Sequence, residues 1–345
     1  MTDGGAFWVG GYTPEMGGSG SGISRWRADG DAFVAAGPAH PTPSPSFLAR
    51  HPRLPVLYSA DESAGTVSAF RITAAGGELS PLGSRPAGPA VCHVAVSPSG
   101  DHLAATCWGD GTVALYPIDP EGALGEPVFA TPAEDPHPAL RATTPPPAGL
   151  EASSRAHMSL WLGPEEVVTT DLGYDLLRVF SVRDGRLHPT STVELPFGCG
   201  PRHLVALSDD LLVVCTEYSC EALSVVRDGA GRRLAARLPL TPDSPRPGET
   251  AAHIEASPGG LLHVGLRGSD RIAVLRCDEA GALAGIGAFA SGGSLPRHHA
   301  VEGRVLRVAH QGSDEITTHR VDDGGLSTGV VDRAAVGSPT VILAS

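Results

Sequence analysis

The stretch CHVAVSPSGDHLAATCWGDGTVALYPID, residues 92–119, contains a pattern that recurs along the chain. It reads as a strand, a Ser-Pro-x-Gly turn, a second strand, a small Gly-Asp-Gly turn and a third strand. A matching copy, HIEASPGGLLHVGLRGSDRIAVLRCDEAG, covers residues 253–281. Two such copies far apart in one chain indicate a repeat protein whose unit is a small antiparallel sheet.

The first strand of this unit can be placed seven times. Its anchor positions are Phe47, His93, His157, His203, Ile254, His298 and Thr340. The intervals between them run from 42 to 64 residues, close to the ~40 to 50 residues of a four-stranded propeller blade. No window has a convincing helical period. The seven anchors therefore predict an all-β chain with seven blades.

The two ends of the sequence complement each other under this interpretation. SPTVILAS (338–345) is a first strand with nothing after it, whereas AFWVGGYT (6–13) and SGISRWRAD (21–29) supply a second and a third strand with no first. Joined in one blade, the N- and C-terminal strands close the ring and leave no blade edge unpaired. We expect a seven-bladed β-propeller that forms a single domain over residues 1–345.

One interval is longer than the others and contains an insertion. TPAEDPHPALRATTPPPAGLEAS, at about residues 131–153, is Pro-rich and has no periodicity, which is typical of a surface loop. It leads into the strand that carries His157. We therefore expect it to lie over one mouth of the ring.

Charge and composition narrow the classes of partner. The 345-residue chain has a formal net charge of −13 and no Lys/Arg-rich run, so we expect no nucleic-acid partner and no membrane partner, both of which need a basic face. The start, MTDGGAFWVGGYT, has no basic or apolar leader pattern, and no segment approaches the ~18 apolar residues of a membrane span. We expect a cytoplasmic protein whose six scattered cysteines are reduced and buried.

Two positions of each blade should meet at the central channel, because a hairpin joins the first and second strands at their other end. The residues just before the anchors are Ser46, Cys92, Ala156, Arg202, His253, Arg297 and Pro339. The residues that end the second strands are Tyr12, Glu62, Trp108, Leu172, Glu217, Arg267 and Gln311. These columns place charged groups and imidazoles where a channel would be open to solvent. In a purely structural alternative, the histidines only satisfy strand ends by hydrogen bonding.

The sequence resembles the lactonase-type seven-bladed propellers, which include the bacterial 6-phosphogluconolactonase of propeller type and the fungal carboxy-cis,cis-muconate lactonising enzyme. The resemblance spans nearly the whole chain and rests on FWVGGYT (7–13), PSFLARHP (45–52), CHVAVSPSGDHL (92–103), GPRHLVAL (200–207), LPRHHAV (295–301) and SPTVILA (338–344). It implies a catalytic set made of His157, Arg202, Glu217 and Arg267. It also implies the propeller fold reached above from the repeats.

Two positions depart from the family pattern. Many members read Pro-His-x-His at the third first strand, whereas this chain has Ser154, Arg155, Ala156 and His157. At the position of His253, relatives usually carry an acidic residue. Both departures bear on the identity of the substrate more than on the fold.

These residue types suit lactone hydrolysis, which needs a base for water, cationic groups for the oxyanion and an anchor for the rest of the substrate. We expect His157 to act as the base and Glu217 to orient it or to take part in the proton transfer. Arg202 and Arg267 should bind an anionic oxygen through paired N–H groups. Further substrate contacts are expected from Arg155, Arg297, His93, His253, Gln311 and Glu62. No cofactor and no metal are expected, because the histidine spacing gives no metal motif.

Three functions remain open at this point. The first is a lactonase that acts on an anionic sugar lactone, with 6-phosphogluconolactone as the substrate implied by the resemblance. The second is a cycloisomerase or lactonising enzyme that acts on a muconate-like dicarboxylate, because the same base and arginines can run proton abstraction and ring closure. The third is a propeller that serves as a non-catalytic binding platform. In the first two cases the partner is a small anionic lactone or carboxylate.

Overall fold

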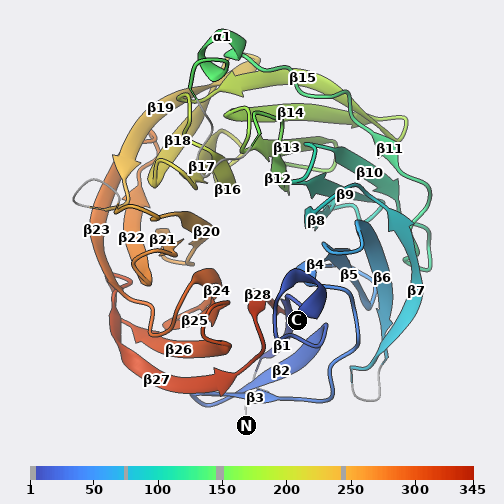
Figure 1. Cartoon of the computed structure of the whole chain (residues 1–345), viewed down its shortest axis with the longest axis vertical. Coiled ribbons are helices and arrows are strands. Elements are labelled where there is room, and N and C mark those ends of the chain that lie inside the picture. Colours follow the sequence, from blue (N-terminus) through green and yellow to red (C-terminus); the bar gives the residue numbers. More distant parts are fainter. Residues whose placement is uncertain (1–4, 74–76, 145–150, 242–245) are drawn as a thin grey trace.

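The chain forms a ring of seven sheets around a central axis (Figure 1). The computed structural model describes residues 5–73, 77–144, 151–241 and 246–345, and within them each of the seven sheets has four antiparallel strands. The strands of a sheet follow one another in chain order from the axis outwards, except in the blade that joins the termini. The predicted all-β, seven-bladed propeller is confirmed.

We number the blades along the chain and give their strands from the axis outwards. Blades 1 to 3 comprise β4 (Pro45–Arg50), β5 (Val56–Asp61), β6 (Thr66–Ile72) and β7 (Leu79–Pro86); β8 (Val91–Val96), β9 (His102–Cys107), β10 (Val113–Pro117) and β11 (Val128–Phe129); and β12 (Ala156–Trp161), β13 (Glu166–Asp171), β14 (Leu176–Arg183) and β15 (Arg186–Glu194). Blades 4 to 6 comprise β16 (Pro201–Ser208), β17 (Leu211–Thr216), β18 (Glu221–Asp228) and β19 (Gly231–Pro239); β20 (Ala251–Ala256), β21 (Leu261–Leu266), β22 (Arg271–Cys277) and β23 (Leu283–Ala290); and β24 (Pro296–Glu302), β25 (Val305–His310), β26 (Glu315–Val321) and β27 (Ser327–Ala335). Blade 7 comprises β28 (Pro339–Ala344), β1 (Ala6–Gly11), β2 (Ser24–Asp29) and β3 (Ala32–Ala35).

Blade 7 closes the ring as predicted from the two ends of the sequence. Its innermost strand, β28, pairs antiparallel with β1, in a register that sets Trp8 opposite Leu343 and Val9 opposite Ile342. The backbone N–H of Tyr12 donates to the carbonyl of Ser338 over 3.0 Å and continues this contact beyond the paired strands. The last strand of the chain is therefore the innermost strand of blade 7, whose other three strands come from the start of the chain.

The hydrophobic core lies between neighbouring blades. One cluster joins Tyr58 of blade 1 to Val94 of blade 2, and equivalent clusters join the next blades. The second strands are enclosed on both faces, so every residue of β5 and of β17 is buried. This burial explains why the second strands read as unbroken apolar runs such as LLVVCT, residues 211–216.

The Ser-Pro-x-Gly motif forms the hairpin between first and second strands. The N–H of Gly100 donates to the carbonyl of Ser97 over 2.8 Å, and Gly260 donates to Ser257 over 2.9 Å. Both glycines have φ of +74°, a conformation that side-chain-bearing residues rarely adopt. The motif thus fixes the hairpin at the end of the blade away from the candidate site.

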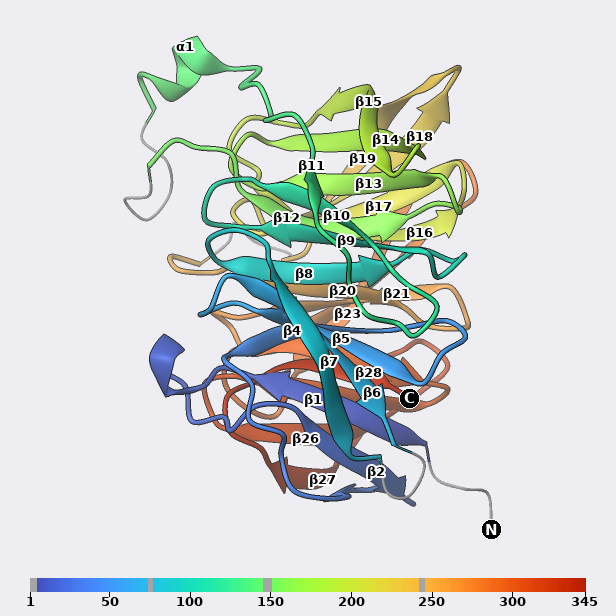
Figure 2. The same ribbon diagram turned by 90° about the vertical axis from the view of Figure 1, so that its right-hand side faces the viewer.

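The Pro-rich insertion does not cover the mouth of the ring in its described part. Its short helix α1 (Pro138–Arg141) lies at the outer margin in the axial view and projects beyond the sheets in the side view (Figures 1 and 2). Arg141 anchors it through ion pairs of 3.0 Å to Asp135 and 3.2 Å to Asp175. The expectation of a loop over the mouth is therefore wrong for these residues, and residues 145–150 lie outside the described part.

Two other expectations can be compared with the structure. Among the described residues, no helix is long and apolar enough to cross a membrane. All six cysteines are free thiols, five of them buried and Cys277 partly so. The reduced, buried state expected of the cysteines is therefore confirmed for five side chains and partly for the sixth.

Candidate active site

A β-bulge near the start of the first strand sets the side chains that reach the axis. In blades 2, 4 and 6 the extra residue of the bulge is Cys92, Arg202 and Arg297 respectively. In blade 3 the register shifts between Ala156 and Met158, so the extra residue is His157. His157 is therefore equivalent to Arg202 and not to the anchor His203, and the anchor assigned from the sequence was wrong by one residue in this blade. In blade 7, likewise, the extra residue is Thr340.

The second column of axial residues was placed correctly from the sequence. Each of its seven members directly follows the last residue of a second strand, as Glu62 follows β5 and Glu217 follows β17. Five of them, together with four bulge residues, line a pocket of about 220 Å³. The lining residues are Tyr12, Glu62, Cys92, Trp108, His157, Arg202, Glu217, Arg267 and Arg297. This volume is below the range of pockets for drug-sized ligands and suits a small metabolite.

Six of the ten site residues predicted from the sequence line this pocket. They are Glu62, His157, Arg202, Glu217, Arg267 and Arg297. Three further lining residues, Tyr12, Cys92 and Trp108, were missed. They belong to the same two columns, so their position in the repeat was the signal that could have identified them.

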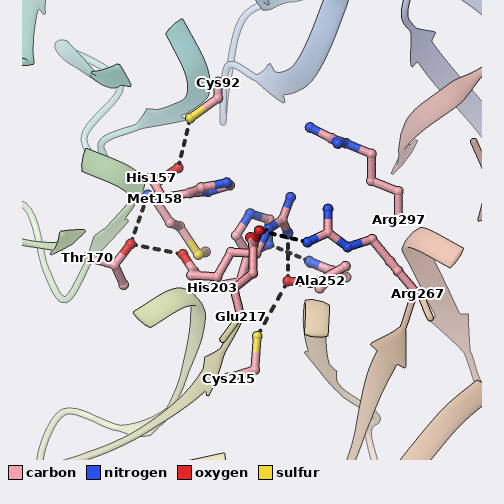
Figure 3. A network of polar contacts seen from close by, with 12 residues as sticks. Cys92, His157, Met158, Thr170, His203, Cys215, Glu217, Ala252, Arg267 and Arg297 are labelled. Carbon is pink, nitrogen blue, oxygen red and sulfur yellow. Dashed lines mark hydrogen bonds and ion pairs between the residues drawn. The ribbon is translucent and has the colours of Figure 1, made fainter. Parts of the chain in front are cut away.

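Glu217 holds two of the arginines in place. Its carboxylate oxygens lie 2.9 Å from Nε of Arg202 and 2.9 Å from an Nη atom of Arg267, and Arg202 also donates to the carbonyl of Ala252 over 2.6 Å (Figure 3). Although burial alone would raise it, the two guanidinium groups hold the pKa of Glu217 below its ordinary value. Both carboxylate oxygens are occupied, so Glu217 is better placed to orient the arginines than to accept a proton.

Arg297 is fixed by a second group of residues. It donates to the hydroxyl of Tyr12 over 2.7 Å and to the side-chain carbonyl of Gln311 over 3.1 Å. The Tyr12 hydroxyl in turn donates to the carboxylate of Glu62, at 3.0 and 3.1 Å. Burial raises the pKa of Tyr12, so the phenol stays protonated. Gln311 thus supports Arg297 from outside the pocket.

His157 offers a neutral imidazole to the pocket. The residue is only 5% exposed, and its Nδ1 has no hydrogen-bond partner among the described residues. Burial, and then the charges of Arg202 and Arg297, lower its pKa well below the ordinary 6.5. Near neutral pH this side chain is therefore an uncharged base, as general base catalysis requires.

Arg155 supports the pocket wall from behind. Its guanidinium lies 4.1 Å from the ring centre of Trp108, a cation–π contact, and it donates to the Trp108 carbonyl over 3.4 Å. It is not among the residues that line the pocket. The structure therefore places Arg155 behind Trp108, so that it reaches the pocket only through the indole.

His93 and His253 lie in a layer of rings beside the pocket residues. Neighbouring rings in this layer have centroids 3.8 to 5.9 Å apart, and the layer consists of Phe47, His93, His203, His253 and His298. His157 touches it through His203, at 5.2 Å. Neither His93 nor His253 lines the pocket. The layer packs rings from five blades against one another around the axis.

The charge of the pocket is opposite to that of the whole chain. Three arginines and two glutamates line it, which leaves one net positive charge if His157 and Tyr12 are neutral. The chain as a whole carries −13. A cationic, partly enclosed site in an acidic protein favours a small anion.

Comparison with known proteins shows the family of the chain. A family model described as "Lactonase, 7-bladed beta-propeller" matches residues 6–344. The chain belongs to this family. The 6-phosphogluconolactonase of Bacillus subtilis strain 168 is 28% identical to this chain over 302 residues. The matched region covers 84% of this chain and 83% of the relative. Family and relative together indicate a lactone hydrolase.

Solved structures repeat the fold. The periplasmic gluconolactonase PpgL of Pseudomonas aeruginosa superposes with a TM-score of 0.86 at 23% identity and covers 98% of each chain. A putative 6-phosphogluconolactonase from Bacteroides uniformis gives a TM-score of 0.87 at 22% identity, with 100% of each chain covered. At these sequence identities the similarity shows that the chain has the same fold as these proteins over nearly its whole length.

Proposed function

We propose that the protein hydrolyses an anionic sugar lactone and that 6-phosphogluconolactone is its substrate. One observation carries the proposal: Arg202 and Arg267 are fixed on Glu217 in the same net-positive pocket as the neutral imidazole of His157. This arrangement supplies both a base and cationic donors that need no rearrangement before reaction. The substrate class follows the activity named for the Bacillus subtilis relative.

In the proposed mechanism His157 removes a proton from a water molecule as that water attacks the lactone carbonyl carbon. The carbonyl oxygen becomes an oxyanion, and N–H groups of Arg202 and Arg267 stabilise it. The ring C–O bond of the tetrahedral intermediate then breaks, and the leaving oxygen takes the proton from His157. Because the pKa of His157 is lowered, its protonated form is a strong enough acid for this return step.

The remaining arginine would bind the anionic tail of the substrate. Arg297 is held by Tyr12 and Gln311 and makes no direct ion pair among the described residues. A phosphate or carboxylate could therefore accept hydrogen bonds from it without displacing a carboxylate. This division leaves Arg202 and Arg267 for the reacting centre.

A panel assay of the purified protein tests the proposal. The panel contains phosphorylated, carboxylated and neutral lactones, and a muconate-like dicarboxylate for the reverse reaction. Each reaction is followed by proton release, and its product is then analysed. The proposal expects fastest turnover of the phosphorylated sugar lactone. Turnover of the dicarboxylate alone would identify a lactonising enzyme, and binding without turnover of any compound would identify a binding platform.

A further inference from the structure

Two adjacent blades bring three metal-binding side chains together. His253 and Glu255 are two residues apart on β20, so they share a face of that strand. His299 lies on β24, which packs against β20 from the next blade. Each side chain offers one ligand atom, and the three atoms all lie within 4.8 Å of one another. None of the three residues lines the candidate active site.

Hydrogen bonds hold the two imidazoles so that one nitrogen of each stays available. Nε2 of His299 donates to the carbonyl of His263 over 3.1 Å, which leaves Nδ1 of His299 with its lone pair. The Nδ1 atoms of His253 and His203 share a hydrogen bond of 2.9 Å. With His253 as the donor, its Nε2 keeps the lone pair. This is the usual arrangement of metal-binding histidines, whose second nitrogen is held by a neighbouring group.

Glu255 needs a counter-charge that the described residues do not supply. One carboxylate oxygen accepts the backbone N–H of Val301 over 3.2 Å, and no ion pair to Glu255 is found in the described part of the chain. The nearby Glu302 is paired with Arg307 over 2.8 Å. Glu255 is half-buried. Taking a carboxylate charge even partly out of water without a cation is costly, whereas a bound divalent ion would compensate it.

We propose that His253, Glu255 and His299 bind one divalent transition-metal ion, with Zn²⁺ the best suited, and that this ion ties blade 5 to blade 6. Two imidazoles and a carboxylate are a ligand set that Zn²⁺ accepts at about 2.0 to 2.2 Å, with water in the remaining position. At these lengths the ligand atoms lie about 3 to 3.5 Å apart, so small side-chain rotations must draw the three groups together. The ion would be separate from the lactone chemistry.

The sequence alone gave no sign of this site. The two histidines are 46 residues apart and belong to different repeats, so no short ligand motif connects them. The earlier expectation of no metal rested on that spacing. Only the packing of β20 against β24 brings the ligands to one place.

The test is stoichiometric metal binding by the full chain, prepared without a histidine tag and treated with EDTA. Zn²⁺ is titrated against a chromophoric chelator, and the melting temperature is measured with and without Zn²⁺. The proposal expects one equivalent bound and a higher melting temperature with the metal. Co²⁺ in its place should give the ligand-field absorption of a site with nitrogen and oxygen ligands.

Two variants and a matched control make the result specific. Glu255→Gln and His299→Gln should each abolish the stoichiometric binding and the Zn²⁺-dependent rise in melting temperature. Glu255→Gln should also leave the metal-free protein about as stable as the parent, because Glu255 forms no ion pair among the described residues that the amide would break. His310→Gln, which changes a buried histidine of blade 6 outside the cluster, should keep the binding.

Two results would overturn the proposal. One is a parent protein that binds no Zn²⁺ at the concentration of the protein. The other is a folded Glu255→Gln or His299→Gln variant that binds and responds as the parent does. Should one variant fail to fold, the other decides, and the parent titration decides by itself if it is negative.

Discussion

His157 and Arg202 occupy equivalent positions in adjacent blades: each is the extra residue of the bulge in its first strand, β12 and β16. Both side chains line the same pocket. A bulge re-aims a side chain without changing the strands around it. The repeat therefore supplies a base from one blade and a cation from the next, and the residue type at one repeated position sets the chemistry of the site.

Arg267→Lys should slow the hydrolysis of charged and neutral lactones alike, although it keeps the charge. Lysine cannot present two parallel N–H groups, and it would lose the geometry set by Glu217. We expect a loss of about 1 to 3 kcal/mol in the stabilisation of the transition state, measured as the fall in kcat/KM. Neutral lactones should lose as much, because the oxyanion forms at the reacting carbonyl in both classes of substrate.

Arg276→Lys is the matched control for this variant, because Arg276 is exposed on β22 of the same blade. It should behave as the parent does. A loss confined to charged lactones in Arg267→Lys would show that Arg267 binds the anionic tail of the substrate instead of the oxyanion.

Deleting residues 338–345 should open the ring. The deletion removes β28, the inner strand of blade 7, and with it Val341 and Ile342, which are 1% and 3% exposed. Burying two such side chains stabilises the fold by roughly 3 to 6 kcal/mol, and the edge of β1 would be left unpaired. We expect low soluble yield or aggregation, measured by size-exclusion chromatography and thermal melting.

Deletion of Ser345 alone is the control and should be tolerated, because this residue follows β28. A protein without residues 338–345 that remained monomeric with an unchanged melting temperature would contradict the proposed closure.

Stability should fall as the pH drops below about 6.5. Burial is the main cause that lowers the pKa of nine histidines: His93, His157, His203, His253, His263, His298, His299, His310 and His319. Below their ordinary pKa of 6.5 the unfolded chain takes up protons that the folded chain does not, so unfolding becomes easier as the pH falls. Each such histidine lowers the free energy of unfolding by up to about 1.4 kcal/mol for every pH unit below 6.5, until the pKa that it has in the folded protein is reached.

Buried carboxyl groups act in the opposite direction. Burial raises the pKa of Asp61 to about 6 and that of Glu255 to about 8, and it also raises the pKa of Asp171. The folded state holds these protons more tightly and gains stability as the pH falls. Three carboxyls against nine histidines leave a net loss. Urea unfolding of the EDTA-treated protein at pH 8, 7, 6 and 5.5 measures this net loss of stability. A free energy of unfolding that stays constant from pH 7 to 5.5 would show that the histidines are not held neutral.

The sequence predicted the blades because their signals are local. Apolar runs and Ser-Pro-x-Gly turns recur with the unit, and the ends of the second strands follow directly from them, so Glu62, Glu217 and Arg267 were placed correctly. The first-strand column failed at His157 because a bulge adds one residue without a periodic signal. A shift of one residue turns a side chain to the other face.

Other parts of the site depended on contacts between blades. Whether Arg155 reaches the pocket or stands behind Trp108 depends on the stacking of two side chains from blades 3 and 2. Gln311 was placed at the correct strand end but supports Arg297 instead of lining the pocket. Such relationships need the packing of the ring, which no single repeat contains.

The steady-state kinetics of His157→Gln test the central claim most directly, measured on the best lactone of the panel from pH 5 to 9. The account predicts that kcat falls by roughly 10² to 10⁴ while KM stays within a few-fold, because a base acts in the transition state. The melting temperature should change by only a few degrees.

In the parent protein kcat/KM should be flat around neutrality. Its acid limb should lie below the 6.5 of an ordinary imidazole, because burial and the neighbouring arginines lower the pKa of His157, and this limb should be absent from the variant. A His157→Gln protein that keeps near-native turnover and the acid limb of the parent would contradict the account and point to Glu62 as the base.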